Sequence, residues 1–179
     1  MPENMKRTDR LRRDAESTMR KIRAIAQHIR NVEDNCLMLG EKLIESGEVE
    51  IGKSLIANGY IHDASKFHGI EFEFMAPGVP TEEEGAKLKL KLAVMHHNRT
   101  NSHHPEFWGG IDHMPRVAVA EMVADWKSRS EEFGTSLRDW IEEQATKRFG
   151  FGKDDDVYKE IYKFVDLLCP KPFENITQS

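Results

Sequence analysis

The sequence predicts an all-α protein, a single-domain bundle of five to six helices. Apolar residues recur every three or four positions along most of the chain, which is the period of an amphipathic helix. Runs of alternating β-branched residues, which would predict strands, are missing. The 179 residues, of which 39% are hydrophobic and 32% charged, suit one globular domain with a single core.

The first helix is expected over residues 8–46, either as one long helix or as two abutting ones. Ser46-Gly47 is expected to end it, because glycine readily adopts the left-handed conformation that follows a helix. A second helical segment follows over residues 50–67, with an interruption near Asn58-Gly59. The apolar stripe of the first helix consists of Ile22, Ile25, Ile29, Val32, Cys36, Leu39 and Leu43.

The middle of the chain predicts a third helix between two loops. A Pro-Gly-Val-Pro loop occupies residues 77–80, and Thr81 with Glu84 has the spacing of a capping box. The helix should therefore run from Thr81 to about Arg99. Residues 100–114 are polar and contain proline and glycine, which predicts a loop.

Three further helices complete the predicted bundle. Pro115 suits the first turn of a fourth helix that reaches about residue 132. Ser136 should cap a fifth helix, which ends near Gly150. The acidic run Asp154–Asp156 opens a sixth, and Pro170 stops it after Leu168.

Charge is distributed unevenly along the chain, whose net charge is -5. Residues 1–30 contain nine Lys/Arg and four Asp/Glu, a net +5, so the remainder carries -10. The basic segment is a solvated helix face, a tail that docks on an acidic neighbour, or a flank that attracts anionic substrates. We divide the chain into a basic helical extension (1–19), a helical domain (20–170) and a C-terminal tail (171–179). The acidic total argues against a stable nucleic-acid complex.

Other features indicate a cytoplasmic protein. No run of about 18 apolar residues exists, so no membrane span is expected. The polar N-terminal segment lacks the apolar core of a secretory signal. Cys36 and Cys169 lie among apolar neighbours without CxxC spacing, which predicts buried thiols in a reducing compartment.

Histidine placement is the strongest functional signal, because seven of the eight histidines lie between residues 62 and 113. Histidine is the commonest metal ligand and the usual proton carrier near neutral pH. The segment 96–108 is especially dense in polar groups. It either contributes to a metal site or to proton transfer, or forms a polar loop packed by Phe107 and Trp108. Its polar residues include His96, His97, Arg99, Asn101, His103, His104 and Glu106.

The dipeptide His62-Asp63 offers two ligand types that bind borderline divalent metals. Lys66 follows one turn later and can reach a phosphate oxygen. The alternative is a helix C-terminus with favourable histidine and lysine charges. His28 is either a further ligand or a hydrogen-bonded core residue. Asp125, at the edge of an apolar face, is either a ligand or a salt-bridge partner of Arg129 or Arg99, because a bare buried carboxylate is costly.

The order His, His-Asp, Asp on separate helices resembles the HD superfamily of metal-dependent phosphohydrolases. The closer similarity is to an HD-like family of bacterial and phage proteins known only as a domain of unknown function, and it covers roughly residues 20–168. Three motifs carry it. They are His-Asp-x-Ser-Lys-Phe at 62–67 followed by Glu71, His-x3-Asn-x-His-His at 97–104 followed by Phe107 and Trp108, and Glu-Met-Val-x-Asp-Trp at 121–126.

The resemblance implies an all-α HD-type domain with a divalent metal ion, which would be Mn, Co, Ni, Zn, Fe or Mg. Asp63 would bridge to a second metal ion if His97 and either His103 or His104 supply its other ligands. His96 is an extra histidine beside the matching His97, so which of the two faces the site is open. The ligands implied for the first ion are His28, His62, Asp63 and Asp125.

The activity implied is hydrolysis of a nucleotide or another small phosphate ester, as by a 5'-nucleotidase or a dNTP or cyclic-nucleotide hydrolase. The residues expected to take part in catalysis, by stabilising phosphoryl charge or moving protons, are Lys66, Glu71, Arg99, His103 and His104. Those expected to contact the substrate are Lys66, Arg99, Asn101 and Trp108. The long first helix and the habit of the superfamily favour a homodimer.

Two alternatives stay open. One is a di-iron oxygenase on the same scaffold, which needs the full set of six ligands. Its iron content and its requirement for oxygen would distinguish it from a hydrolase. The other is a non-catalytic module that binds a nucleotide signal or a host protein tightly, without turnover or bound metal. A phage-encoded protein of either kind would act in the host cytoplasm.

Overall fold

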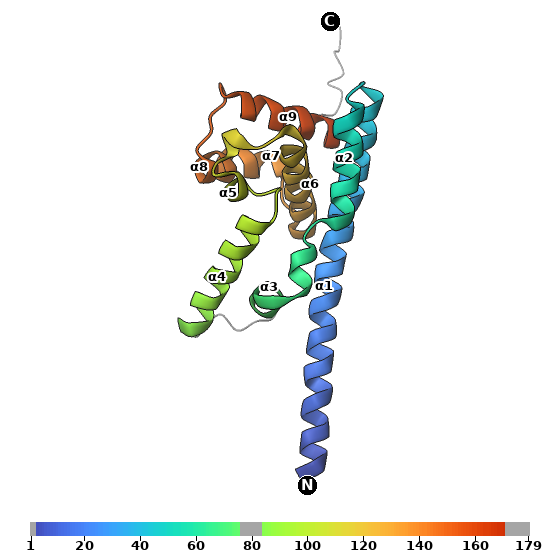
Figure 1. The fold of residues 1–179 in the computed structure, drawn as a ribbon, viewed down its shortest axis with the longest axis vertical. Coiled ribbons are helices and arrows are strands. Elements are labelled where there is room, and N and C mark those ends of the chain that lie inside the picture. Colours follow the sequence, from blue (N-terminus) through green and yellow to red (C-terminus); the bar gives the residue numbers. More distant parts are fainter. Residues whose placement is uncertain (1–2, 76–83, 171–179) are drawn as a thin grey trace, which may run out of the picture.

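The computed structural model describes residues 3–75 and 84–170, and this part of the chain is helical throughout, with no strand (Figure 1). The all-α fold class is thus confirmed. The longer helices are α1 (Glu3–Glu45), α2 (Val49–Ile61), α4 (Glu84–Thr100), α6 (Arg116–Phe133) and α9 (Asp156–Leu168). The short elements are η1 (Ala64–Phe67), α3 (Gly69–Phe74), α5 (Pro105–Trp108) and η2 (Ile111–His113). α7 (Leu137–Trp140), the π-helical η3 (Ile141–Ala145) and α8 (Thr146–Phe149) follow one another without a break.

α1 is one continuous helix, so the alternative of two abutting helices is wrong. Figure 1 shows its N-terminal part projecting well beyond the other helices, and nearly all side chains from residue 7 to residue 20 are exposed. In the apolar stripe, Ile22 and Ile29 are half-buried, and Ile25, Val32, Cys36, Leu39 and Leu43 are buried. Val32 and Leu39 are completely buried because α2 and α6 cover this half of α1.

Glycines allow α1 and α2 to pack closely, because they have no Cβ atom. A Cβ atom on Gly52 would lie 2.5 Å from the carbonyl oxygen of Gly40, and one on Gly59 would lie 2.8 Å from the Cβ of Cys36. The interruption expected near Asn58-Gly59 is therefore wrong: α2 passes through both residues unbroken. Gly59 serves close helix packing there, and the tertiary contact outweighs its low helix propensity.

α6 is the central helix of the fold. Every residue from Ala118 to Ala124 is buried, which is typical of a helix surrounded on all sides. α1, α2 and α9 pack against it, and Phe164 and Ile161 of α9 complete the core. The ligand candidate Asp125 directly follows this buried run and is itself half-buried.

Most predicted helix ends agree with the structure. The hydroxyl of Ser136 accepts a hydrogen bond from the backbone N–H of Asp139, and Gly47 and Gly150 have positive φ after α1 and α8. Pro115 precedes α6 instead of occupying its first turn. The predicted loop 77–80, the Thr81 cap and the tail 171–179 lie outside the described residues.

Two further predictions, on membrane spans and on the cysteines, can be compared with the structure. No helix in the described ranges is long and apolar enough to cross a membrane. Cys36 is buried as predicted, whereas Cys169 is only half-buried, because it follows the last turn of α9.

Candidate metal centre

The backbone turns sharply at His62-Asp63. The prediction of a helical segment through residue 67 is wrong at this point, because α2 ends at Ile61 and the short η1 begins at Ala64. Asp63 has φ 54°, in the left-handed region, and is the one non-glycine residue of the described ranges with positive φ. Adjacent side chains of a helix point about 100° apart. The break in the helix lets both side chains face the same point.

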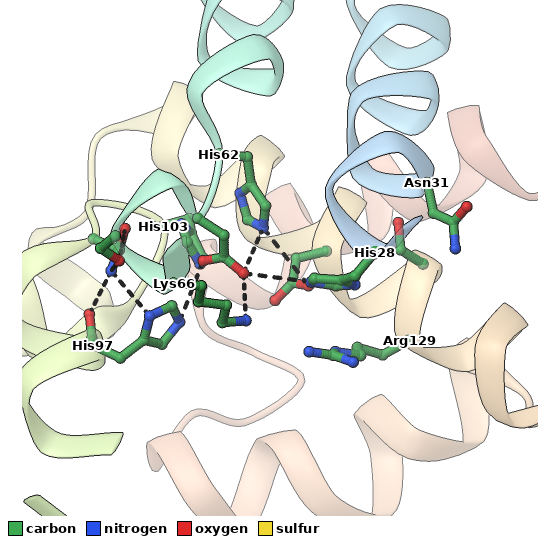
Figure 2. Close-up of polar contacts among 12 residues, drawn as sticks. His28, Asn31, His62, Lys66, His97, His103 and Arg129 are labelled. Atoms are coloured by element: carbon green, nitrogen blue, oxygen red, sulfur yellow. Dashed lines mark hydrogen bonds and ion pairs between the residues drawn. The ribbon is translucent and has the colours of Figure 1, made fainter. Parts of the chain in front are cut away.

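The carboxylate of Asp63 lies among four histidines, which Figure 2 labels as His28, His62, His97 and His103. Its Oδ2 atom is 3.4 Å from the Nε2 atoms of both His28 and His62. Its Oδ1 atom is 3.3 Å from Nε2 of His97 and 3.5 Å from Nε2 of His103. Each oxygen of this one carboxylate therefore faces a different pair of imidazoles.

Asp125 joins the first pair. Its Oδ1 atom lies 3.2 Å from Nε2 of His28 and 4.0 Å from Nε2 of His62. Arg129, the salt-bridge partner considered from the sequence, instead pairs with Glu132 at 2.9 Å. The four ligands expected for the first ion thus converge in space.

Several of the atoms that face the centre are buried and lack hydrogen-bond partners. Buried polar atoms are normally hydrogen-bonded, so several orphans in one place point to a missing ligand. Within the described residues they include Nε2 of His28, His62, His103 and His104 and Oδ1 of Asp63 and Asp125.

Glutamates hold the other nitrogen of each imidazole. The Nδ1 atom of His28 lies 2.9 Å from Oε1 of Glu132, and that of His97 lies 2.8 Å from Oε2 of Glu71. A hydrogen bond from Nδ1–H leaves the lone pair of Nε2 free, which is the usual arrangement around a bound metal.

Glu121 holds two imidazoles at once. Its Oε1 atom is 3.0 Å from Nδ1 of His62 and 3.4 Å from Nδ1 of His103. Sequence reasoning assigned no role to Glu121 or Glu132. A signal was present, because these residues and Asp125 are spaced by four and seven positions and therefore share a face of α6.

The carboxylates make this cluster attractive to cations. Burial lowers the pKa of His62, but Asp63, Glu121 and Asp125 outweigh burial and raise it to about 10. Burial raises the pKa of Glu121, but His103 and His62 lower it to about 2. His104 differs, because burial and the neighbouring His103 and His97 lower its pKa to about 2, which keeps it neutral.

The geometry and chemistry of these donors fit divalent metal ions. Two atoms that both lie about 2.0–2.2 Å from one ion are about 3–3.5 Å apart. The separations of 3.2–3.5 Å around Asp63 and between His28 and Asp125 fall in this range. Donor atoms of two further groupings lie within 4.8 Å of one another, namely His28, His62 and Asp125, and His97, His103 and His104.

The structure also resolves which neighbouring histidine faces the centre. His97 does so, whereas the side chain of His96 is 52% exposed and its Nδ1 atom lies 2.7 Å from Oε1 of Glu71. His103 faces Asp63, and His104 adds an unpartnered Nε2 beside it. Glu71 is 1% exposed and binds Ser65 as well as His97, so it lies behind the ligands.

A cavity of about 360 Å³ opens beside the cluster, and Lys66, His97, His104 and Asp125 form part of its wall. Lys66 also contacts Oδ2 of Asp63. Three predicted substrate residues, Arg99, Asn101 and Trp108, do not line this cavity. Arg99 lines a separate hollow with Glu106, and Trp108 packs against Phe107. Asn101 lies behind the centre, where its amide donates to Ser65 at 3.0 Å.

Comparison with known proteins places the chain in a family. The model of a family described as "Family of unknown function (DUF5662)" matches residues 17–167, close to the range over which the sequence resemblance was expected. Searches of the curated proteins and of the solved structures find no match. The match spans the whole cluster from His28 to Glu132 and most of the chain, and the protein therefore belongs to the DUF5662 family.

Proposed function

We propose that this protein is a metal-dependent phosphohydrolase that acts on a small phosphate ester and uses two ions bridged by Asp63. The observation that supports it best is the convergence of the unpartnered Nε2 atoms of His28, His62 and His103 on the two oxygens of this buried carboxylate. The first ion would be held by His28, His62, Asp63 and Asp125. The second would be held by Asp63, His97, His103 and His104.

The ligand order along the chain is that of the HD superfamily, and membership of that superfamily is part of the proposal. Divalent ions in such a site lower the pKa of water toward about 7 and offset the negative charge of a phosphoryl group. His and carboxylate ligands suit several of these ions, so ligand type alone does not select one.

The surrounding side chains have separate tasks in this proposal. Lys66 reaches from η1 to Asp63 and holds its ammonium at the cavity wall, where it would bind a phosphoryl oxygen. Arg129 lines the same cavity and takes the role that the sequence suggested for Arg99. His104 serves as a ligand of the second ion in this proposal, because its unpartnered Nε2 lies in one grouping with His97 and His103.

A di-iron oxygenase is the second candidate, and a specific observation supports it. The six ligands that it requires, with one carboxylate between two histidine sets, lie together in this structure. Iron as the only ion that gives activity, together with oxygen consumption and no phosphate release, would favour it over the hydrolase.

The test combines metal analysis of the purified full-length protein with a phosphate-release screen over small phosphate esters. Each divalent metal is added back separately after chelation. We expect bound metal and metal-dependent phosphate release, both of which Asp63→Ala abolishes while the helical circular dichroism remains. Asp34→Ala, on the exposed face of α1, is the matched control and should behave as wild type. Turnover by Asp63→Ala at the wild-type rate would refute the mechanism.

A non-catalytic module would give a different result in the same experiment. Tight nucleotide binding by a protein that retains no metal and releases no phosphate under any condition would favour that alternative.

A further inference from the structure

We propose that the cavity beside the metal centre binds a phosphate monoester of an aromatic compound, with Trp140 and Phe149 contacting the ring and Arg129 and Arg148 its anionic and polar groups. The inference rests on the proposed function, because it names the substrate class of the same site. Nucleoside monophosphates are the natural members of this class.

One side of the cavity is aromatic. Trp126 from α6, Trp140 from α7 and Phe149 from α8 all line it. Trp126 and Phe149 are stacked with ring centroids 5.8 Å apart, and Trp140 meets Trp126 edge-on at 4.8 Å. Trp126 is buried, whereas Trp140 and Phe149 are half-buried and keep surface free toward the cavity. Such a wall favours a flat ring as ligand.

The same cavity is rich in positive charge. Lys66, Arg129 and Arg148 line it, and the side chain of Arg129 is 43% exposed although it pairs with Glu132. Arg148 lies over the ring of Phe149, 4.9 Å from its centroid, and its ion pair with Glu106 is long at 3.7 Å. A guanidinium placed over an aromatic ring can contact the edge or the substituents of a stacked ligand.

Cavity size limits the ligand. The volume of about 360 Å³ is near the lower end of the roughly 300–1,000 Å³ usual for small-molecule sites. Residues of the metal centre and the aromatic residues line the same cavity, so one compact ligand can touch both. These dimensions suit one ring system and one phosphate group, and they do not suit a polymer.

The first experiment measures binding without turnover. Full-length protein treated with EDTA is titrated calorimetrically with adenosine 5'-monophosphate and with ribose 5-phosphate, which lacks only the base. We expect adenosine 5'-monophosphate to bind about 10-fold more tightly or better, as stacking of one base on aromatic side chains would give. Phe149→Leu and Trp140→Leu should each reduce this preference to less than about threefold.

The arginines are tested with matched charge controls. Arg129→Ala and Arg148→Ala should weaken binding of adenosine 5'-monophosphate about 10-fold, as loss of a charge-assisted contact would. Lys53→Ala removes an exposed positive charge on α2 and should leave binding unchanged. Thermal unfolding of every variant identifies any loss of fold, and the arginine variants keep the test decisive if an aromatic variant unfolds.

The outcomes separate this inference from the proposed function. Equal affinity for the two probes, or no binding of either, overturns the inference. So does phosphate release at equal efficiency from both esters, although that result would leave the hydrolase intact. Base-dependent binding that Phe149→Leu abolishes, without phosphate release under any metal, supports the assignment of the cavity and overturns the hydrolase.

Discussion

The Nε2 atom of His28 on α1 lies 3.2 Å from the Oδ1 atom of Asp125 on α6. Both atoms are buried and have no hydrogen-bond partner in the described part of the chain. Asp125 has a pKa well below its usual range: burial opposes this, but the contact with His28 and the charge of His62 outweigh it. The buried imidazole and the ionised carboxylate supply two of the four donors that the proposed first ion requires, and they lie on helices remote in sequence.

The two halves of the centre should be separable by mutation. We expect wild-type protein to bind about two divalent ions per chain. His28→Ala and His97→Ala should each reduce this to about one, because each removes a ligand of one ion only, while Asp63→Ala should bind almost none. Metal content after gel filtration measures the effect. Equal loss of metal in all three variants would contradict two half-sites that share Asp63.

Glu121 should act through the imidazoles that it holds. Glu121→Gln removes the negative charge that orients His62 and His103, and metal affinity should fall about 10- to 100-fold. Competition with a fluorescent chelator gives the affinity. Glu143→Gln, at an exposed position, is the control. A variant with lower thermal stability but wild-type affinity would show that Glu121 is only structural.

The contact between α1 and α2 should not tolerate a methyl group. Gly52→Ala places a Cβ 2.5 Å from the carbonyl oxygen of Gly40, and we expect a loss of about 1–3 kcal/mol in the free energy of unfolding. Gly85→Ala meets open space in α4 and should instead stabilise the protein by about 0.5–1 kcal/mol. Urea unfolding curves of both variants provide the comparison. Equal stability of the two variants would argue against close packing at Gly52.

Stability should depend on Glu142 in acid. Hydrogen bonds from Tyr158 and Tyr162 and the charge of Lys153 lower the pKa of this carboxyl from 4.5 to about 2. Because the pKa of Glu142 is lower in the folded state than in the unfolded state, its ionised carboxylate stabilises the folded protein above pH 4.5. This contribution is lost as the pH falls toward about 2. Glu142→Gln should therefore cost up to about 1 kcal/mol at pH 7, because the site is partly exposed.

The pH dependence of that variant is the measurement. Urea unfolding of wild type and Glu142→Gln at several pH values should give curves that differ at pH 7 and converge as the pH approaches about 2. A difference that does not change with pH would mean that Glu142 acts through packing instead of charge.

The helices and most of their ends were predictable from the sequence. The apolar period of the segment 22–43, the cap at Ser136 and the glycine at position 150 are local signals, and neighbouring residues produce their effects. Histidine density and the His62-Asp63 pair also indicated the region of the candidate metal centre. These features depend on interactions within about one helical turn, and the residues that make such interactions are close together in the sequence.

Tertiary structure decided which side chains meet. Whether His97 or His96 faces Asp63, and whether Arg129 or Arg99 lines the cavity, depends on how α4 and α6 pack against the rest of the fold. The break after Ile61 aims both side chains of the His62-Asp63 pair at one point, and close packing at Gly52 and Gly59 sets the position of α2. Convergence of distant atoms follows from packing angles and side-chain rotamers, and no local pattern encodes these.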